Sequence, residues 1–176
     1  MYLISFYFDD QTKKRIQSWM DEISTGTGNT FMTDHQVPPH ITVSAFDARE
    51  DVQAVEALEA IAGRMVPFEV QIVSVGTFFP YVIFAQALLD QTLHETSEFV
   101  RSEVEKIPDA RISRYYQHFS WLPHITLGKT LSQNQMQGAF QILQKKFVPL
   151  KARVESVGVA KPNPHRDLKI IDFKNM

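Results

Sequence analysis

The chain of 176 residues contains no cysteine. It therefore has neither disulfide bonds nor thiolate metal sites, which suits a reducing compartment without requiring one, so a cytoplasmic location is expected only by default. Long apolar runs are also lacking. The segments 81–85 and 87–89 are far shorter than the roughly 20 residues that cross a bilayer, so no membrane helix is expected. The first residues lack the features of a secretory signal and favour a strand.

Neither sign of charge predominates, because 18 basic residues face 20 acidic ones and the net charge is -2. Surfaces that track a nucleic-acid backbone are usually basic across a whole face. A nucleic-acid substrate would therefore be bound at an end or in a small pocket. The apolar fraction of 44% is ordinary for a folded chain, and the length suits a single domain over 1–176 with a substantial core.

Four helices are expected from apolar residues spaced at i, i+3, i+4 and i+7. They lie around 16–23 and at about 51–64, 91–107 and 132–147. The last begins with Ser132 and Gln135 in the spacing of a capping box, and Pro108 ends the third. Between the helices lie strand-like runs at 3–8, 40–46, 68–77, 82–88, 124–129, 152–160 and 168–173.

The order strand, helix, strand, helix, long strand occurs in residues 3–77 and again in residues 82–160. Ser74-Val75-Gly76 in the first long strand recurs as Ser156-Val157-Gly158 in the second. Both long strands also change the face on which their apolar residues lie, as a β-bulge would make them do. We expect an internal duplication that gives an α+β fold with two pseudo-symmetric lobes, at about 1–80 and 81–176, around a cleft.

The strand that follows the first helix of each repeat carries a His-x-Thr motif. The two copies are identical at four positions and aliphatic at the fifth: Pro39-His40-Ile41-Thr42-Val43 and Pro123-His124-Ile125-Thr126-Leu127. Because strand side chains alternate, each histidine shares one face with its threonine, while the isoleucine between them lies on the other. A lone histidine on a strand is usually structural, but a polar His-Thr pair that occurs twice indicates a functional role.

Two histidines and two hydroxyl donors around one centre suit displacement at phosphorus. One imidazole removes a proton from the attacking water, and the other donates a proton to the leaving oxygen. The threonine hydroxyls can bind the non-bridging oxygens, where negative charge resides. We therefore interpret His40, Thr42, His124 and Thr126 as catalytic residues, with no metal and no cofactor. The sequence leaves open which histidine is the base.

With Lys129 after the second motif, the chain resembles the 2H phosphoesterases, which include enzymes named 2'-5' RNA ligase or RNA 2',3'-cyclic phosphodiesterase. The resemblance spans nearly the whole sequence. It implies a bilobal 2H phosphoesterase-like fold with mainly antiparallel sheets flanked by helices. It also implies catalytic histidines, phosphate-binding threonines and a role in RNA processing on a small nucleotide or an RNA terminus. The motif pair does not specify the substrate, and no obligatory protein partner is evident.

Further contacts to the phosphate are expected from Lys129 and Arg166, since the first motif carries no basic residue of its own, and Tyr115 and Phe78 are expected to contact the substrate by stacking on a base. Trp121 and Phe119, by contrast, are expected to be core residues.

Three hypotheses compete: a cyclic phosphodiesterase, a zinc hydrolase and a non-catalytic module that binds a nucleotide or RNA end. The zinc hypothesis is weakest because a catalytic zinc usually needs three protein ligands. Activity on 2'-5' linkages, including ligation, is also left open.

Overall fold

The structure, a computed structural model, describes residues 1–162 and 165–173. The sequence periodicities appear as alternating strands and helices. In chain order these are β1 (Tyr2–Phe8), α1 (Asp10–Thr27), α2 (Phe31–Asp34), β2 (His40–Asp47), α3 (Asp51–Ala62), β3 (Phe68–Phe78), β4 (Val82–Ala87), α4 (Gln91–Val104), β5 (Arg111–Ile112), the 3-10 turn η1 (Arg114–Tyr116), β6 (His124–Gly128), α5 (Gln133–Lys146), β7 (Leu150–Pro162) and β8 (His165–Asp172).

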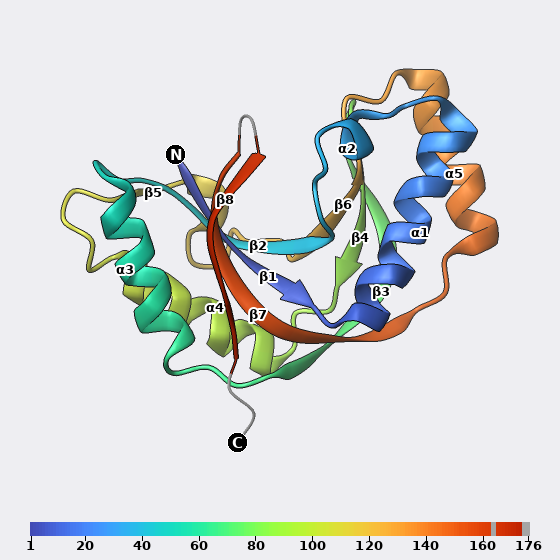
Figure 1. The fold of residues 1–176 in the computed structure, drawn as a ribbon. Helices are drawn as coiled ribbons and strands as arrows, with labels where there is room; N and C mark the ends of the chain where they lie inside the picture. Colours follow the sequence, from blue (N-terminus) through green and yellow to red (C-terminus); the bar gives the residue numbers. More distant parts are fainter. Residues whose placement is uncertain (163–164, 174–176) are drawn as a thin grey trace.

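All described strands belong to one antiparallel sheet with the order β5-β2-β1-β7-β3-β4-β6, and β8 pairs with β7 beside this path. Figure 1 shows α1 and α5 side by side at one end of the strongly curved sheet, and α3 with α4 at the other. The expected α+β class with an antiparallel sheet flanked by helices is confirmed.

The two repeats exchange elements in space. Within each repeat the first strand pairs with the His-x-Thr strand, as β1 does with β2 and β4 with β6. The long strands cross over, because β7 of the second repeat pairs with β1 and β3 of the first repeat pairs with β4. The helices are exchanged as well, since α1 of the first repeat packs on α5 and β6 of the second. The division of the chain into lobes near residue 80 stays a prediction.

Both expected bulges are present. In β3 the pairing with β4 passes from Ile72 to Ser74, which leaves Val73 as the extra residue. In β7 the partners of β1 pass from Val154 to Ser156, which leaves Glu155 as the extra residue. One inserted residue reverses the alternation of side chains, so the apolar residues on either side of each bulge keep facing the core.

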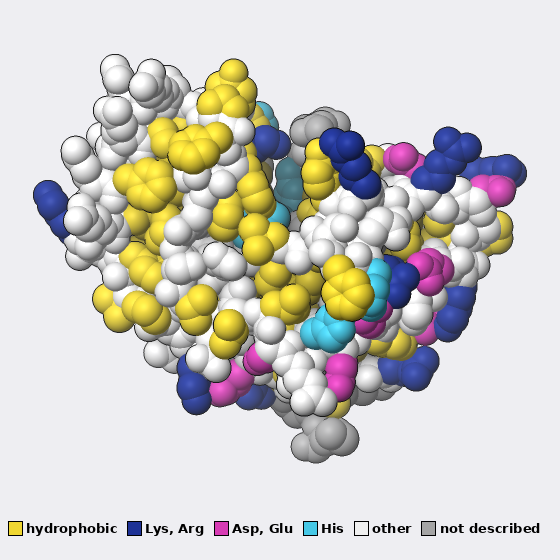
Figure 2. Space-filling model, turned by 180° about the vertical axis from the view of Figure 1, so that it is seen from behind, with side chains coloured by type: hydrophobic (Ala, Val, Ile, Leu, Met, Phe, Trp, Pro, Cys, Tyr) yellow, Lys and Arg dark blue, Asp and Glu magenta, His cyan; other side chains and the backbone are white. Residues whose placement is uncertain are grey.

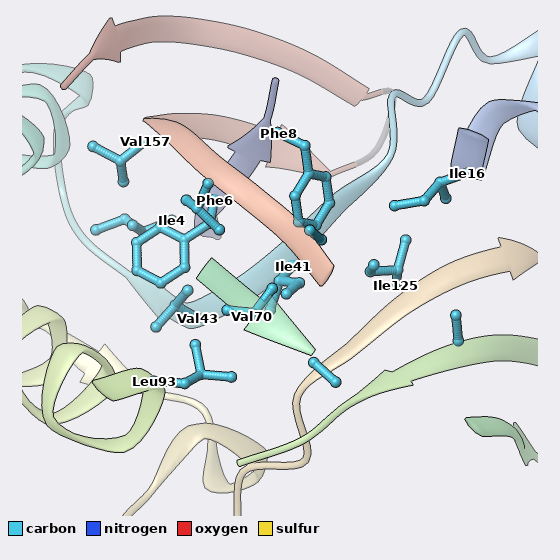
Figure 3. Close-up of a cluster of buried hydrophobic side chains, with 14 of the residues drawn as sticks. Ile4, Phe6, Phe8, Ile16, Ile41, Val43, Val70, Leu93, Ile125 and Val157 are labelled. Atoms are coloured by element: carbon cyan, nitrogen blue, oxygen red, sulfur yellow. The ribbon is translucent and has the colours of Figure 1, made fainter. Parts of the chain in front are cut away.

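Helix starts follow from capping by side chains. The hydroxyl of Ser132 accepts from the backbone N–H of Gln135, and the side-chain oxygen of Gln135 accepts from the backbone N–H of Ser132. The expected capping box is therefore confirmed. Asp9 and Asp90 cap α1 and α4 by accepting from the amide three residues onward. The helices bury their apolar faces against the sheet in one contiguous core, part of which is shown in Figure 3. None of the described helices is long and apolar enough to span a bilayer.

The loop regions differ most from the expectations. The short elements α2, β5 and η1 carry too few residues for a periodic pattern and were not expected. The last strand begins at His165 rather than at residue 168. Phe119 is not a core residue, because it is 89% exposed at a positive φ of 59°, where a loop projects its ring into solvent. Trp121 does pack against the core, as expected.

Candidate active site

The strands β2 and β6 place the two motifs by simple alternation. Ile41 and Ile125 are fully buried, and Figure 3 shows both in the cluster of core side chains. The flanking histidines, His40 and His124, are half-buried on the opposite face. The apolar face of each strand therefore fixes the position of the polar one.

Each histidine is oriented by its own backbone. The Nδ1 atom of His40 lies 2.7 Å from the carbonyl oxygen of Pro38, and Nδ1 of His124 lies 2.8 Å from that of Leu122. A carbonyl only accepts, so Nδ1 carries the hydrogen in both rings. When neutral, each imidazole therefore has its lone pair on Nε2, the nitrogen that is available to a substrate. The two motifs share this anchor two residues before each histidine.

Both motifs open into one cavity of about 540 Å³. Its lining comes from strands, from α2 and from loops distant in sequence: Leu3, Phe31, Met32, His35, Val37, His40, Thr42, Tyr116, His124, Thr126, Lys129, Pro162 and His165. Figure 2 shows histidine side chains in the hollow between two raised parts of the surface. The structure thus brings together all four expected catalytic side chains and Lys129.

The two threonines lie in different surroundings. Thr42 is 7% exposed, and its hydroxyl lies 3.3 Å from that of Ser5, where either can donate. The indole of Trp121 also donates to the backbone oxygen of Thr42 at 3.0 Å, which ties the loop before β6 to β2. Thr126 is only half-buried at the cavity wall. Both threonines line the cavity, and each hydroxyl can act as a hydrogen-bond donor.

Burial shifts the titration of both histidines. It lowers the pKa of His40 to about 4, against an opposing effect of the Pro38 carbonyl, because a charged ring loses hydration there. Burial also lowers the pKa of His124, again opposed by its backbone hydrogen bond. Both rings are thus favoured in the neutral form at neutral pH in the free protein, so that Nε2 of each carries an unprotonated lone pair.

His40 lies among polar rings. The ring centroid of Tyr7 is 6.1 Å from that of His40, and the ring of His165 stacks on His40 at 6.0 Å. The hydroxyl of Tyr7 donates to Asp167 at 2.8 Å. The Nε2 atom of His165 lies 3.4 Å from the same carboxylate, without hydrogen-bond geometry. His165 and Tyr7 lower the pKa of Asp167 although burial opposes them, so Asp167 is ionised.

His124 lies among hydrocarbon rings. The centroids of Phe78 and Phe84 are 4.9 and 5.3 Å from that of His124. Beyond them opens a second pocket of about 460 Å³, mostly apolar. It shares His124 and Tyr116 with the main cavity and is lined by Phe78, Tyr115, Tyr116, Ser120, Trp121, Leu122 and His124. Two of the expected substrate contacts, Phe78 and Tyr115, therefore lie together beside the second motif.

The other two expected substrate contacts, Lys129 and Arg166, differ in position. Lys129 reaches the cavity, with Nζ 5.4 Å from the ring centroid of Phe31. Arg166 is not among the residues that line either pocket, and its guanidinium lies 3.8 Å from Asp51. Its binding role stays a prediction.

Sequence reasoning missed Tyr7, His165 and Asp167. The spacing of His165 and Asp167 would have placed both on one face, had the last strand been extended back to residue 165.

No group of three or more histidine, cysteine or acidic side chains is arranged to hold a metal ion within residues 1–162 and 165–173. The geometry instead gives an antiparallel α+β fold in which two duplicated His-Thr pairs face one cavity. This combination defines the class of two-histidine phosphoesterases.

The family model described as "2'-5' RNA ligase superfamily" matches residues 8–166, and the chain belongs to this superfamily, the 2H phosphoesterases. Membership is consistent with an activity on phosphodiesters. No curated protein matches the sequence.

Solved structures share the fold at low identity. A crystal structure of LigT from E. coli complexed with 3'-AMP has a TM-score of 0.63 at 14% identity, over 99% of this chain and 98% of that chain. A Thermus thermophilus protein, TT0787, has a TM-score of 0.62 at 17% identity, over 98% and 97%. Usb1 of Kluyveromyces marxianus has a TM-score of 0.52 at 14% identity, over 99% and 97%.

Proposed function

We propose that the protein is a metal-independent cyclic phosphodiesterase that hydrolyses a 2',3'-cyclic phosphate of RNA or of a related small nucleotide. The observation that carries the proposal is the duplicated anchoring of His40 and His124. Each ring uses Nδ1 on its own backbone, at 2.7 and 2.8 Å, and so offers Nε2 to the same cavity. Two such imidazoles supply a base and an acid for one displacement.

The reaction balances without a further reactant. His40 Nε2 takes a proton from water as the water oxygen bonds to phosphorus. The bond from phosphorus to one ribose oxygen breaks, and that oxygen takes a proton from His124 Nε2. The product is a phosphomonoester. Thr42, Thr126 and Lys129 donate to the non-bridging oxygens, whose charge persists through the reaction.

Two features support His40 as the base and His124 as the acid. A pKa of about 4 keeps His40 neutral at the pH where it must accept a proton. The aromatic pocket adjoins His124, and its rings suit stacking against a nucleobase. In a cyclic phosphate the leaving oxygen stays on the ribose, so a nucleoside in that pocket puts the leaving oxygen beside His124. The anionic phosphate then favours protonation of His124.

The ligands in solved structures of similar proteins bear on the substrate. LigT structures have been solved with 3'-AMP and with ATP, which are nucleotides. Two pockets that share His124 and Tyr116 suit the two parts of such a ligand: an apolar, aromatic pocket for the nucleoside, and a cavity lined by hydroxyls, imidazoles and a lysine for the phosphate on its ribose.

The test is a substrate panel followed by chromatography of the products. It contains the four 2',3'-cyclic nucleotides, linear 2'-5' and 3'-5' dinucleotides, and ADP-ribose cyclic phosphate, each assayed with and without EDTA. We expect turnover of a cyclic phosphate that EDTA does not reduce. Loss of turnover in EDTA, with recovery on adding zinc, would establish the zinc hydrolase instead.

Two other outcomes separate the remaining alternatives. Cleavage of 2'-5' dinucleotides alone, or their formation from a cyclic phosphate and a 5'-hydroxyl end, would identify a 2'-5' phosphodiesterase or ligase. Tight binding of nucleotides with no product from any member of the panel would identify a binding module.

A further inference from the structure

The glycines of the two Ser-Val-Gly segments, Gly76 and Gly158, play the same structural role. A Cβ atom on Gly158 would lie 2.8 Å from Cε2 of Tyr7, and one on Gly76 would lie 2.5 Å from Cζ of Phe84. Each glycine therefore lets an aromatic ring cross its strand at close approach. Tyr7 then packs against His40, and Phe84 packs against His124. The duplicated segment makes room for the ring beside each motif histidine.

The rings of Tyr7 and Phe84 differ by one hydroxyl, and the hydroxyl of Tyr7 forms a hydrogen bond. Tyr7 crosses Gly158 of β7 and donates to Asp167 of β8 at 2.8 Å. Burial, followed by the charge of Asp167 and the hydrogen bond to it, raises the pKa of Tyr7, so the hydroxyl stays protonated as a donor. The same carboxylate lies 3.4 Å from His165, whose ring stacks on His40.

We propose that Tyr7, Asp167 and His165 are positioning residues for His40. The two rings hold the imidazole in place, and the Asp167 carboxylate stabilises the positive charge that His40 acquires when it takes the proton from water. This role rests on the proposed function, because it presupposes that His40 is a base. The three residues are named the His40 cradle below.

The charged and titratable groups around His40 act with opposite signs. Asp167 favours the protonated form of His40, whereas His165 of β8 and His124 of β6 oppose it. Tyr7 of β1 is neutral, and the other titratable groups on the cavity wall are His35, Tyr116 and Lys129. Removing Asp167 and removing His165 should therefore shift the titration of His40 in opposite directions. A packing role alone would give no such pair of signs.

The experiment uses Asp167→Asn and His165→Phe in the full chain. The first replaces the charged carboxylate by a neutral amide of nearly the same shape, and the second keeps a ring against His40. The imidazole resonances of His40 are assigned by their loss in His40→Ala, and their titration is followed by NMR without substrate. The pKa of His40 should fall in Asp167→Asn and rise in His165→Phe. In cyclic nucleotide assays kcat should fall roughly tenfold in Asp167→Asn, which corresponds to about one pKa unit of lost stabilisation of protonated His40.

Tyr2→Phe is the matched control. Tyr2 lies on β1 like Tyr7, and its hydroxyl donates to the carboxylate of Asp51 at 2.7 Å, but its ring packs against Phe46 rather than against a motif histidine. Tyr7→Phe should lower kcat and shift the titration of His40, while Tyr2→Phe should change neither. Circular dichroism and urea unfolding at neutral pH identify variants that fail to fold.

Shifts of opposite sign in the two cradle variants would support the proposal. Shifts of the same sign, unchanged His40 titration in both, or equal effects of Tyr7→Phe and Tyr2→Phe would overturn it. In His165→Phe the expected rise moves the pKa of His40 towards neutral pH. This shift can therefore be measured even if Asp167→Asn unfolds at the acid pH that its own titration needs. Because NMR needs no turnover, the cradle is tested even when no substrate of the panel is cleaved, and the two proposals fail separately.

Discussion

The two motif histidines are held alike and surrounded differently. Both donate Nδ1–H to the carbonyl oxygen two residues earlier, and both pack against a ring that crosses a glycine of a repeated segment. Around His40 the neighbours are Tyr7 and His165, joined by Asp167. Around His124 they are the phenyl rings of Phe78 and Phe84.

The comparison teaches that the two copies of the motif share one anchoring geometry, whereas general acid–base catalysis needs two histidines that behave differently. A base and an acid must be in opposite protonation states when the reaction starts. Identical surroundings would give both imidazoles the same preference. The polar cradle and the hydrocarbon rings allow His40 and His124 to respond differently to a proton and to a bound anion.

The largest expected effect comes from removing either histidine. His40→Ala and His124→Ala should each lower turnover by about 10²–10⁴-fold, the usual worth of a positioned base or acid. The double variant should lose far less than the sum of the two losses in free energy, because both residues act in one transition state. Steady-state kinetics on the best cyclic nucleotide measures all three.

A substrate with a very good leaving group separates the two histidines. Such a group needs no proton on departure, so it should restore turnover in His124→Ala and leave His40→Ala slow. Rescue of His40→Ala alone would reverse the assignment of base and acid. Equal rescue of both variants would show that the asymmetry around the rings has no catalytic counterpart.

The second effect concerns stability and pH. His40 has a pKa of about 4 in the folded protein, below the ordinary value of 6.5, so the unfolded chain takes up this proton first as the pH falls. The contribution of neutral His40 is complete above pH 6.5 and is lost as the pH falls towards 4, by up to about 3 kcal/mol. Urea unfolding at several pH values should show this loss in the wild type and a smaller one in His40→Asn.

The same measurement on His124→Asn sharpens the comparison. Burial also lowers the pKa of His124. Like His40→Asn, this variant should therefore lose less unfolding free energy than the wild type as the pH falls. An acid loss that is identical in the wild type and in both variants would contradict the buried, neutral state of the two rings.

The third effect distinguishes the threonines. Each of Thr42→Ala and Thr126→Ala removes one donor to a charged oxygen, so each should raise the barrier by about 1.5–3 kcal/mol in kcat/KM. Thr42 is also 7% exposed beside Ser5, whereas Thr126 is half-buried. Thr42→Ala should therefore lower the free energy of unfolding as well, while Thr126→Ala should leave it nearly unchanged. Urea titrations check the difference, and equal losses of stability would contradict it.

The sequence predicted those features that repeat along the chain. Alternation placed Ile41 and Ile125 in the core, and the phase slips located the bulges at Val73 and Glu155. Such patterns report local geometry that each repeat encodes for itself. The crossed pairing of β7 with β1 and of β3 with β4 leaves no local trace.

The candidate site divides in the same way. The four motif side chains were expected from the duplicated pattern, and the structure brings them to one cavity. The His40 cradle was not expected, because Tyr7 and Asp167 come from opposite ends of the chain and meet only across Gly158. Phe119 was assigned to the core from its residue type, and its loop conformation overrides that preference.

The smallest effect compares the two glycines that admit the aromatic rings. A methyl group on Gly76 meets only the ring of Phe84, with Cζ at 2.5 Å, whereas one on Gly158 meets Tyr7, Ile170 and the backbone oxygen of Lys169. Gly76→Ala and Gly158→Ala should each cost about 1–3 kcal/mol of unfolding free energy by overpacking. Gly138→Ala is the control, since this glycine lies within α5 with only a methyl group of Thr27 at 3.3 Å, and it should be nearly neutral.

The catalytic readout separates the two glycines, although their costs in stability are similar. Displacing Tyr7 weakens its hydrogen bond to Asp167, so Gly158→Ala should move the acidic limb of kcat/KM, which reports the protonation of the base in the free enzyme. Displacing Phe84 disturbs the packing of His124 without removing a charge, so Gly76→Ala should lower kcat and leave that limb in place. The same shift of the acidic limb in both variants would show that the polar cradle and the phenyl rings act alike, and the functional asymmetry inferred from them would have to be abandoned.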